Sequence, residues 1–172
     1  IVDYVTAYQQ GGTDAMGNVL DKKQERSRAE EYRALLANSP YLVEYNKPFN
    51  DYLAAWPKTK LAGADDALYW AKDTFGLKPV VSAYHETFYK TPRGALMATK
   101  LIGATHFFNA SLELLAGVPA ADGKGLYLLN LYRTRIDPPT GMLAGMLMGK
   151  VRDGIETGVK ENLKRARERL AA

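Results

Sequence analysis

The two histidines are the residues of this chain best suited to acid–base or metal chemistry. They are His85 and His106, the only histidines among 172 residues. Histidine titrates near neutral pH and binds metals, so a pair that converged in a cavity would form an acid–base couple or part of a ligand set. No third ligand stands at helical or hairpin spacing, and Glu86 alternates to the opposite strand face from His85. Hydrogen-bonded or pocket-lining histidines are therefore favoured; we expect no metal and no cofactor, and catalysis remains an alternative.

Two arginines form a second candidate group. Arg133 and Arg135 alternate along one predicted strand face with Tyr127, where two guanidinium groups could meet a carboxylate or phosphate head group at a cavity rim. The competing interpretation is a solvent-facing strand end that pairs with local acids. The carboxylates of Asp65 and Asp66 fall near a predicted helix start, so we interpret them as helix-dipole partners rather than as a catalytic dyad.

A run of glycine and methionine is the third candidate group. Gly141, Gly145 and Gly149 stand four apart, although glycine inside a helix costs about 0.5 to 1 kcal/mol relative to alanine. This spacing fits either close helix packing or space for a ligand, and methionine adapts to varied apolar shapes. The predicted ligand-binding residues are His85, His106, Asn109, Tyr127, Arg133, Arg135, Met142, Met146 and Met148.

The first 76 residues predict a helical segment. The apolar pattern of residues 1–8 ends at Gly11, and Ser27 with Glu30 three residues later forms a capping box for a second helix. Pro40 suits the start of the next helix, a short aromatic helix covers 49–56, and a further one covers 64–75. We expect residues 1–76 to form part of the same domain or an insertion in it. The chain does not start with Met, and we expect it to begin within a longer precursor.

Residues 77–172 predict an antiparallel sheet followed by one long helix. The apolar period changes to two after Gly76, which predicts strands at 79–89, 95–102, 107–118 and 125–136. Short connections favour a four-stranded meander. An amphipathic helix of roughly 30 residues follows Thr140, long enough to cross such a sheet and cover its concave face. The predicted fold class is α+β.

Composition excludes several function classes. The chain has no cysteine, so disulfides and thiolate sites are excluded, and it has no apolar run long enough to span a membrane. From Lys150 onward, seven basic residues face four acidic ones, so this segment carries +3 of the net charge of +4. That mixture favours a solvated helix face over a nucleic-acid site, and peripheral contact with a membrane stays open.

Four segments carry a resemblance to a known family. They are LYWAK at 68–72, FGLKPV at 75–80, KLIGATHFF at 100–108 and YLLNLYRTR at 127–135. With the meander and terminal helix, they resemble the START-like superfamily of hydrophobic-ligand-binding proteins, which has the helix-grip fold. More narrowly, they are similar to bacterial proteins of unassigned activity whose N-termini look exported. The resemblance implies a periplasmic or secreted location, and a cytoplasmic one stays open.

Three functions compete at this point. The first is non-catalytic binding or transfer of an apolar small molecule or lipid between the sheet and the C-terminal helix. The second is a structural or accessory subunit that binds a protein partner through an aromatic layer. The third is a cyclase-like or hydrolase-like enzyme that uses a cavity histidine, for which fold analogy is the only support. The residues of the aromatic layer are Tyr41, Tyr45, Phe49, Tyr52 and Trp56.

Overall fold

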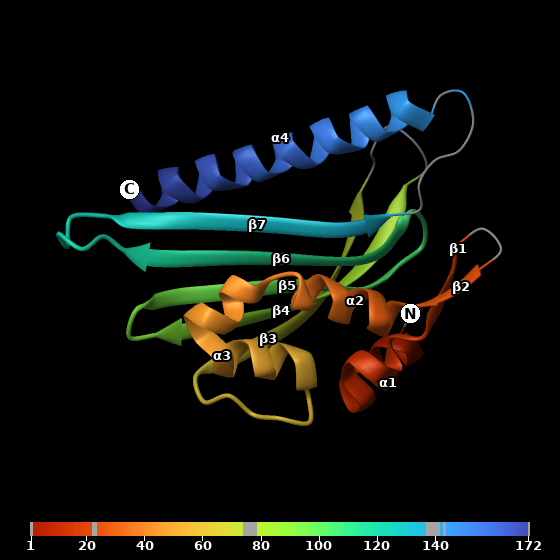
Figure 1. Cartoon of the computed structure of the whole chain (residues 1–172), viewed down its shortest axis with the longest axis horizontal. Coiled ribbons are helices and arrows are strands. Elements are labelled where there is room, and N and C mark those ends of the chain that lie inside the picture. Colours follow the sequence, from red (N-terminus) through yellow and green to blue (C-terminus); the bar gives the residue numbers. More distant parts are fainter. Residues whose placement is uncertain (1, 22–23, 74–78, 137–141, 143, 172) are drawn as a thin grey trace.

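The protein is an α+β structure in which three N-terminal helices cover a five-stranded antiparallel sheet (Figure 1). The computed structural model describes the chain except for residues 1, 22–23, 74–78, 137–141, 143 and 172. The helical elements are α1 (Val2–Gly11), η1 (Gly12–Met16), α2 (Arg28–Ala37), α3 (Pro40–Ala55) and α4 (Ala144–Ala171). The strands are β1 (Asn18–Asp21), β2 (Gln24–Ser27), β3 (Ala64–Asp73), β4 (Val80–Thr91), β5 (Gly94–Ala104), β6 (Phe108–Pro119) and β7 (Leu126–Ile136).

The N-terminal part follows the sequence pattern at its helix starts. The hydroxyl of Ser27 accepts a hydrogen bond from the backbone N–H of Glu30, which confirms the predicted cap of α2. Pro40 is the first residue of α3, where its missing N–H would have no helical partner. The segment is not wholly helical, however, because β1 and β2 pair as a short hairpin before α2.

The prediction of a helix at 64–75 is wrong, because Ala64–Asp73 is strand β3. It pairs antiparallel with β4 over ten residues, which makes β3 the first strand of the sheet and gives a meander of five strands instead of four. The alanines, lysine and aspartates of this segment have low strand propensity, but β-propensity yields readily to strand pairing. Asp65 and Asp66 therefore lie on a strand, and their assignment to a helix start is corrected.

The core lies between the sheet and helices α1, α2 and α3. Cross-strand partners on this face run from Leu68 to His85 to Lys100, and on to Leu112 and Arg133. The buried apolar residues of the core are Tyr8, Met16, Tyr32, Leu35, Leu36, Leu42, Phe49, Leu53, Leu96, Ala98, Ile102, Ala110, Leu112 and Leu114.

The C-terminal helix is present but is less buried than the sequence predicts. In Figure 1, α4 runs along β7, and β6 and β7 lie between α4 and the helices α2 and α3. Its apolar stripe is half-buried at Val151, Ile155 and Leu163, whereas Met148 and Leu170 are exposed. No described residue of α4 is buried. The expectation of a helix that crosses and covers the sheet is thus corrected to one that lies along the last strand.

Candidate functional site

Three places in the molecule hold the chemistry-bearing residues: a buried polar cluster around His85, a pocket beside His106, and the surface of α4. The His85 cluster forms where three elements meet. Tyr8 comes from α1, Asp66 from β3 and His85 from β4. The β3–β4 register sets Asp66 opposite Thr87 and Leu68 opposite His85, so the Asp66 carboxylate and the His85 ring share one sheet face.

Both ring nitrogens of His85 are engaged. Nε2 lies 2.9 Å from Oδ1 of Asp66, and Nδ1 lies 2.8 Å from the hydroxyl of Tyr8. Burial lowers the pKa of His85 and outweighs the hydrogen bond to Asp66, which raises it, so the ring is neutral at pH 7. A neutral ring carries one N–H. The ionised Asp66 only accepts, so Nε2–H donates to Asp66 and the Tyr8 hydroxyl donates to Nδ1.

The carboxylate of Asp66 accepts hydrogen bonds from several side chains of the cluster. Burial opposes its ionisation, but hydrogen bonds from His85, Tyr52 and Thr87 outweigh burial and hold its pKa at about 2. Thr87 Oγ1 donates to Oδ1 at 2.7 Å, while the Tyr52 hydroxyl and the indole N–H of Trp56 donate to Oδ2. The side chain of Asp66 is 24% exposed, against 3% for His85. The carboxylate is thus the part of the cluster nearest to solvent.

Lys100 adds a buried amine to the same region. Its side chain lies beside His85 in the β4–β5 register and is 2% exposed. Nζ donates to the Thr13 hydroxyl at 3.1 Å and lies 4.4 Å from the ring centroid of Tyr32 and 5.2 Å from that of Tyr8. It forms no ion pair with the described residues. Burial therefore lowers its pKa to about 7, and aromatic faces supply most of its contacts.

Aromatic side chains pack against the imidazole of His85. The indole ring of Trp56 stacks on Tyr8 with ring centroids 5.0 Å apart, and lies 4.3 Å from the imidazole of His85. Tyr8 is fully buried, and neither of the two pockets described below is lined by His85 or Asp66. The geometry can therefore hold a proton network in place, with the His85 ring buried and the Asp66 carboxylate partly exposed.

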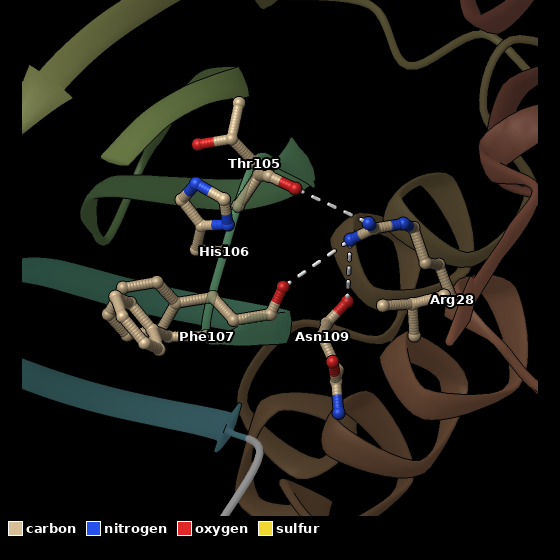
Figure 2. A pocket seen from close by; sticks show the side chains of 8 residues that line it. Arg28, Thr105, His106, Phe107 and Asn109 are labelled. Carbon is tan, nitrogen blue, oxygen red and sulfur yellow. Dashed lines mark hydrogen bonds between the residues drawn. The ribbon is translucent and has the colours of Figure 1, made fainter. Parts of the chain in front are cut away.

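One pocket lies at the turn between β5 and β6 (Figure 2). It has a volume of about 290 Å³ and is lined by Val19, Arg28 and residues 104–109. The guanidinium of Arg28 lies 3.4 Å from the carbonyl oxygens of Ala104, Phe108 and Asn109, on either side of the turn. A second, smaller pocket of about 30 Å³ lies beside Thr13 and Trp56.

Backbone geometry also marks this turn. Phe107 has φ +65°, a left-handed conformation that a bulky residue rarely adopts, and its side chain is exposed. The three Arg28 contacts bracket the turn and help to hold that conformation. Arg28 is missing from the residues expected from the sequence. Its position at the first turn of a capped helix gives no hint of a contact with residues about 80 positions later.

The structure divides the nine predicted ligand residues among separate places. His106 and Asn109 line the β5–β6 pocket together, whereas His85 belongs to the buried cluster. Arg133 and Arg135 do share a strand face, and they contact the Tyr41 hydroxyl and the Glu31 carboxylate. Tyr127 is exposed near the start of β7.

The three methionines are exposed, Met142 just before α4 and Met146 and Met148 in its first turns. An ideal Cβ built on Gly145 or Gly149 meets nothing within 4 Å, so these two glycines do not serve close packing within this chain. Gly141 lies outside the described residues.

Within the described ranges, no group of three or more His, Asp or Glu side chains is arranged to hold a metal ion. Among the described helices, even the 28-residue α4 lacks the hydropathy needed to cross a bilayer.

No protein-family model, no curated protein and no solved structure matches the chain.

Proposed function

We propose that the protein binds an apolar small molecule or lipid without catalysis, between α4 and the sheet. The observation that carries the proposal is the incomplete burial of α4. This 28-residue helix is amphipathic, yet none of its described residues is buried. An apolar stripe that stays partly in contact with water contributes less to stability than a buried one. Binding of an apolar ligand that covers the stripe would therefore be favourable.

The beginning of α4 is suited to accommodate such a ligand. Gly145 and Gly149 leave open space beside the helix, and the side chains of Met146 and Met148 are exposed there. Tyr69 and Phe88, on the sheet face opposite to the His85 cluster, are also exposed. The START-like resemblance in the sequence points to the same class of ligand.

Two observations weigh against the other candidate functions. Both nitrogens of His85 are engaged in hydrogen bonds, and the ring lines neither described pocket, which disfavours catalysis by that histidine. In the aromatic layer, Phe49 and Tyr52 belong to the buried part of the protein, so this surface is smaller than its sequence suggests. We therefore keep ligand binding as the function to test.

The test uses an uncharged apolar fluorophore, N-phenyl-1-naphthylamine, and measures its emission on titration with the protein. We expect saturable binding that Met148→Glu weakens at least tenfold, because a charge on the apolar stripe must be desolvated when the ligand binds. Met148 is 37% exposed, so the helix itself tolerates the glutamate. Met142→Glu is the matched control, because Met142 is fully exposed and its substitution should leave binding unchanged.

Two outcomes would overturn the proposal. One is the absence of saturable binding by the native chain, together with no co-purified lipid in native mass spectrometry. The other is concentration-dependent self-association that Met148→Glu abolishes, measured by sedimentation, with no fluorophore bound. In that case α4 is covered by a second copy of the chain instead of by a ligand.

A further inference from the structure

The β5–β6 pocket has an unneutralised cation in its wall. Arg28 is the only arginine or lysine among the residues that line it, and none of the lining residues is acidic. Arg28 forms no ion pair with any residue that the structure describes. Its three hydrogen bonds go to backbone carbonyl oxygens at 3.4 Å, which is long for a charge-assisted hydrogen bond.

The guanidinium keeps donors for a ligand. Arginine carries five N–H groups, and the carbonyls take two from Nη1 and one from Nη2. The N–H of Nε and the second N–H of Nη2 have no acceptor among the described residues. In arginine, the N–H of Nε and one N–H of Nη2 lie along the same edge of the guanidinium, the edge that binds two oxygens of a carboxylate or phosphate.

The opposite wall of the pocket also suits an anion. The side chain of His106 is exposed and forms no hydrogen bond with the described residues. Figure 2 shows His106 and Phe107 on the turn, with Arg28 facing the turn from α2. An imidazole N–H can donate to an oxygen held by the arginine, and the volume of about 290 Å³ leaves room for a group larger than one water molecule.

We propose that the β5–β6 pocket is a binding site for an anionic oxygen group, a phosphate or a carboxylate, held by Arg28 and contacted by His106. Such a group occurs on a free small molecule and on a lipid head group. The inference does not depend on the apolar site at α4, because it rests on a pocket to which α4 contributes no residue.

The experiment is isothermal titration with inorganic phosphate and with acetate, at fixed ionic strength in chloride. We expect millimolar dissociation constants for at least one anion. His106→Glu should weaken binding at least tenfold, because the new carboxylate pairs with Arg28 and repels the ligand. His106→Gln is the matched control, because it keeps a donor without a negative charge and should stay within about threefold of the native chain.

Arg28→Gln tests the cation directly, with Arg167→Gln on the exposed face of α4 as the control for loss of one charge. We expect a loss of at least tenfold for the first and no change for the second. Arg28 also brackets the turn, so Arg28→Gln could perturb the fold. His106 is exposed, so its two variants should keep the fold and still test the site if Arg28→Gln does not fold.

A parallel arm separates the two sources of the anion. Sedimentation with phosphatidylglycerol vesicles, compared with phosphatidylcholine vesicles, reports binding to a head group. Binding of free anions that is sensitive to His106→Glu supports a soluble ligand, and vesicle binding alone with the same sensitivity supports a lipid head group. Binding that is absent in both arms, or is unaffected by His106→Glu, overturns the site. The fluorophore titration of α4 is unaffected by either outcome.

Discussion

Asp66 and His85 are hydrogen-bonded between neighbouring strands, with 2.9 Å between Oδ1 and Nε2. The two residues are 19 positions apart and lie on β3 and β4, the first two strands of the sheet. This bond anchors a network in which one carboxylate accepts from four side chains, two on β4, one on α3 and one directly after α3. The network therefore ties α3 to the edge of the sheet, and its energetic role can be measured.

Replacing Asp66 should destabilise the fold. In Asp66→Asn, the amide group presents donors to side chains that themselves donate, so we expect a loss of about 1 to 3 kcal/mol in the free energy of unfolding at pH 7. Urea denaturation measures this difference. Asp65→Asn is the matched control, because Asp65 is exposed on the same strand and its side chain forms no hydrogen bond or ion pair with the described residues.

The difference in the free energy of unfolding between the native chain and Asp66→Asn should also depend on pH. A carboxylate with a folded-state pKa of about 2 adds stability above its unfolded pKa of about 3.9 and loses it as the pH falls through about 2. The gap between the native chain and Asp66→Asn should therefore narrow below pH 4. A gap that is constant from pH 7 to pH 3 would contradict the assignment of Asp66 as the charged acceptor.

Lys100 should make the fold more stable in mildly alkaline solution. Its folded-state pKa is about 7, whereas an unfolded lysine titrates near 10.4, so between these values the unfolded chain binds the extra proton. The free energy of unfolding must then rise with pH from about 7 to about 9.5. Lys100→Met should remove this slope and should be more stable than the native chain at pH 7 by about 1 to 4 kcal/mol.

Lys90→Met, at an exposed position on β4, is the control for the Lys100 experiment and should keep the native pH slope. Chemical denaturation at several pH values measures both variants. If Lys100→Met keeps the slope of the native chain, the buried amine is not its origin. Burial also lowers the pKa of His85. Below pH 7, protonation of His85 would therefore add to the pH dependence of the free energy of unfolding.

Two glycines should respond in opposite directions to alanine. At Gly149, an added Cβ meets nothing within 4 Å, so Gly149→Ala should stabilise α4 by about 0.5 to 1 kcal/mol. At Gly94, φ is +131° and a Cβ would lie 2.0 Å from the carbonyl oxygen of Gly117, so Gly94→Ala should cost more than about 2 kcal/mol. Thermal unfolding followed by circular dichroism checks both; destabilisation by Gly149→Ala would indicate a close contact there.

The sequence predicts the elements whose pattern is local and regular. Strands β4 to β7 appear within about two residues of their predicted limits, because their apolar period is two and their turns are short. The cap of α2 is also predicted, since Ser27 and Glu30 are only three residues apart. These features depend on neighbours in the sequence, which a single chain shows directly.

The site is predicted less well because it depends on contacts between distant segments. β3 has a weak strand pattern, so the sequence predicts a helix around Asp66 and does not indicate its hydrogen bond to His85. Arg28 reaches residues 76 to 81 positions away, a contact that no local pattern indicates. The sequence predicts both His106 and Asn109 as ligand-binding residues, and they line the same pocket.

The meander has a consequence for the order in which the chain assembles. Each strand of the sheet pairs with its neighbour in sequence, so each pairing closes a short loop and loses little chain entropy. The bonds from α1 and η1 are different: Tyr8 meets His85 across 77 positions, and Thr13 meets Lys100 across 87. Contacts of this separation form slowly. We therefore expect successive hairpins to form first, and docking of the N-terminal helix, which seals the His85 cluster, to complete folding.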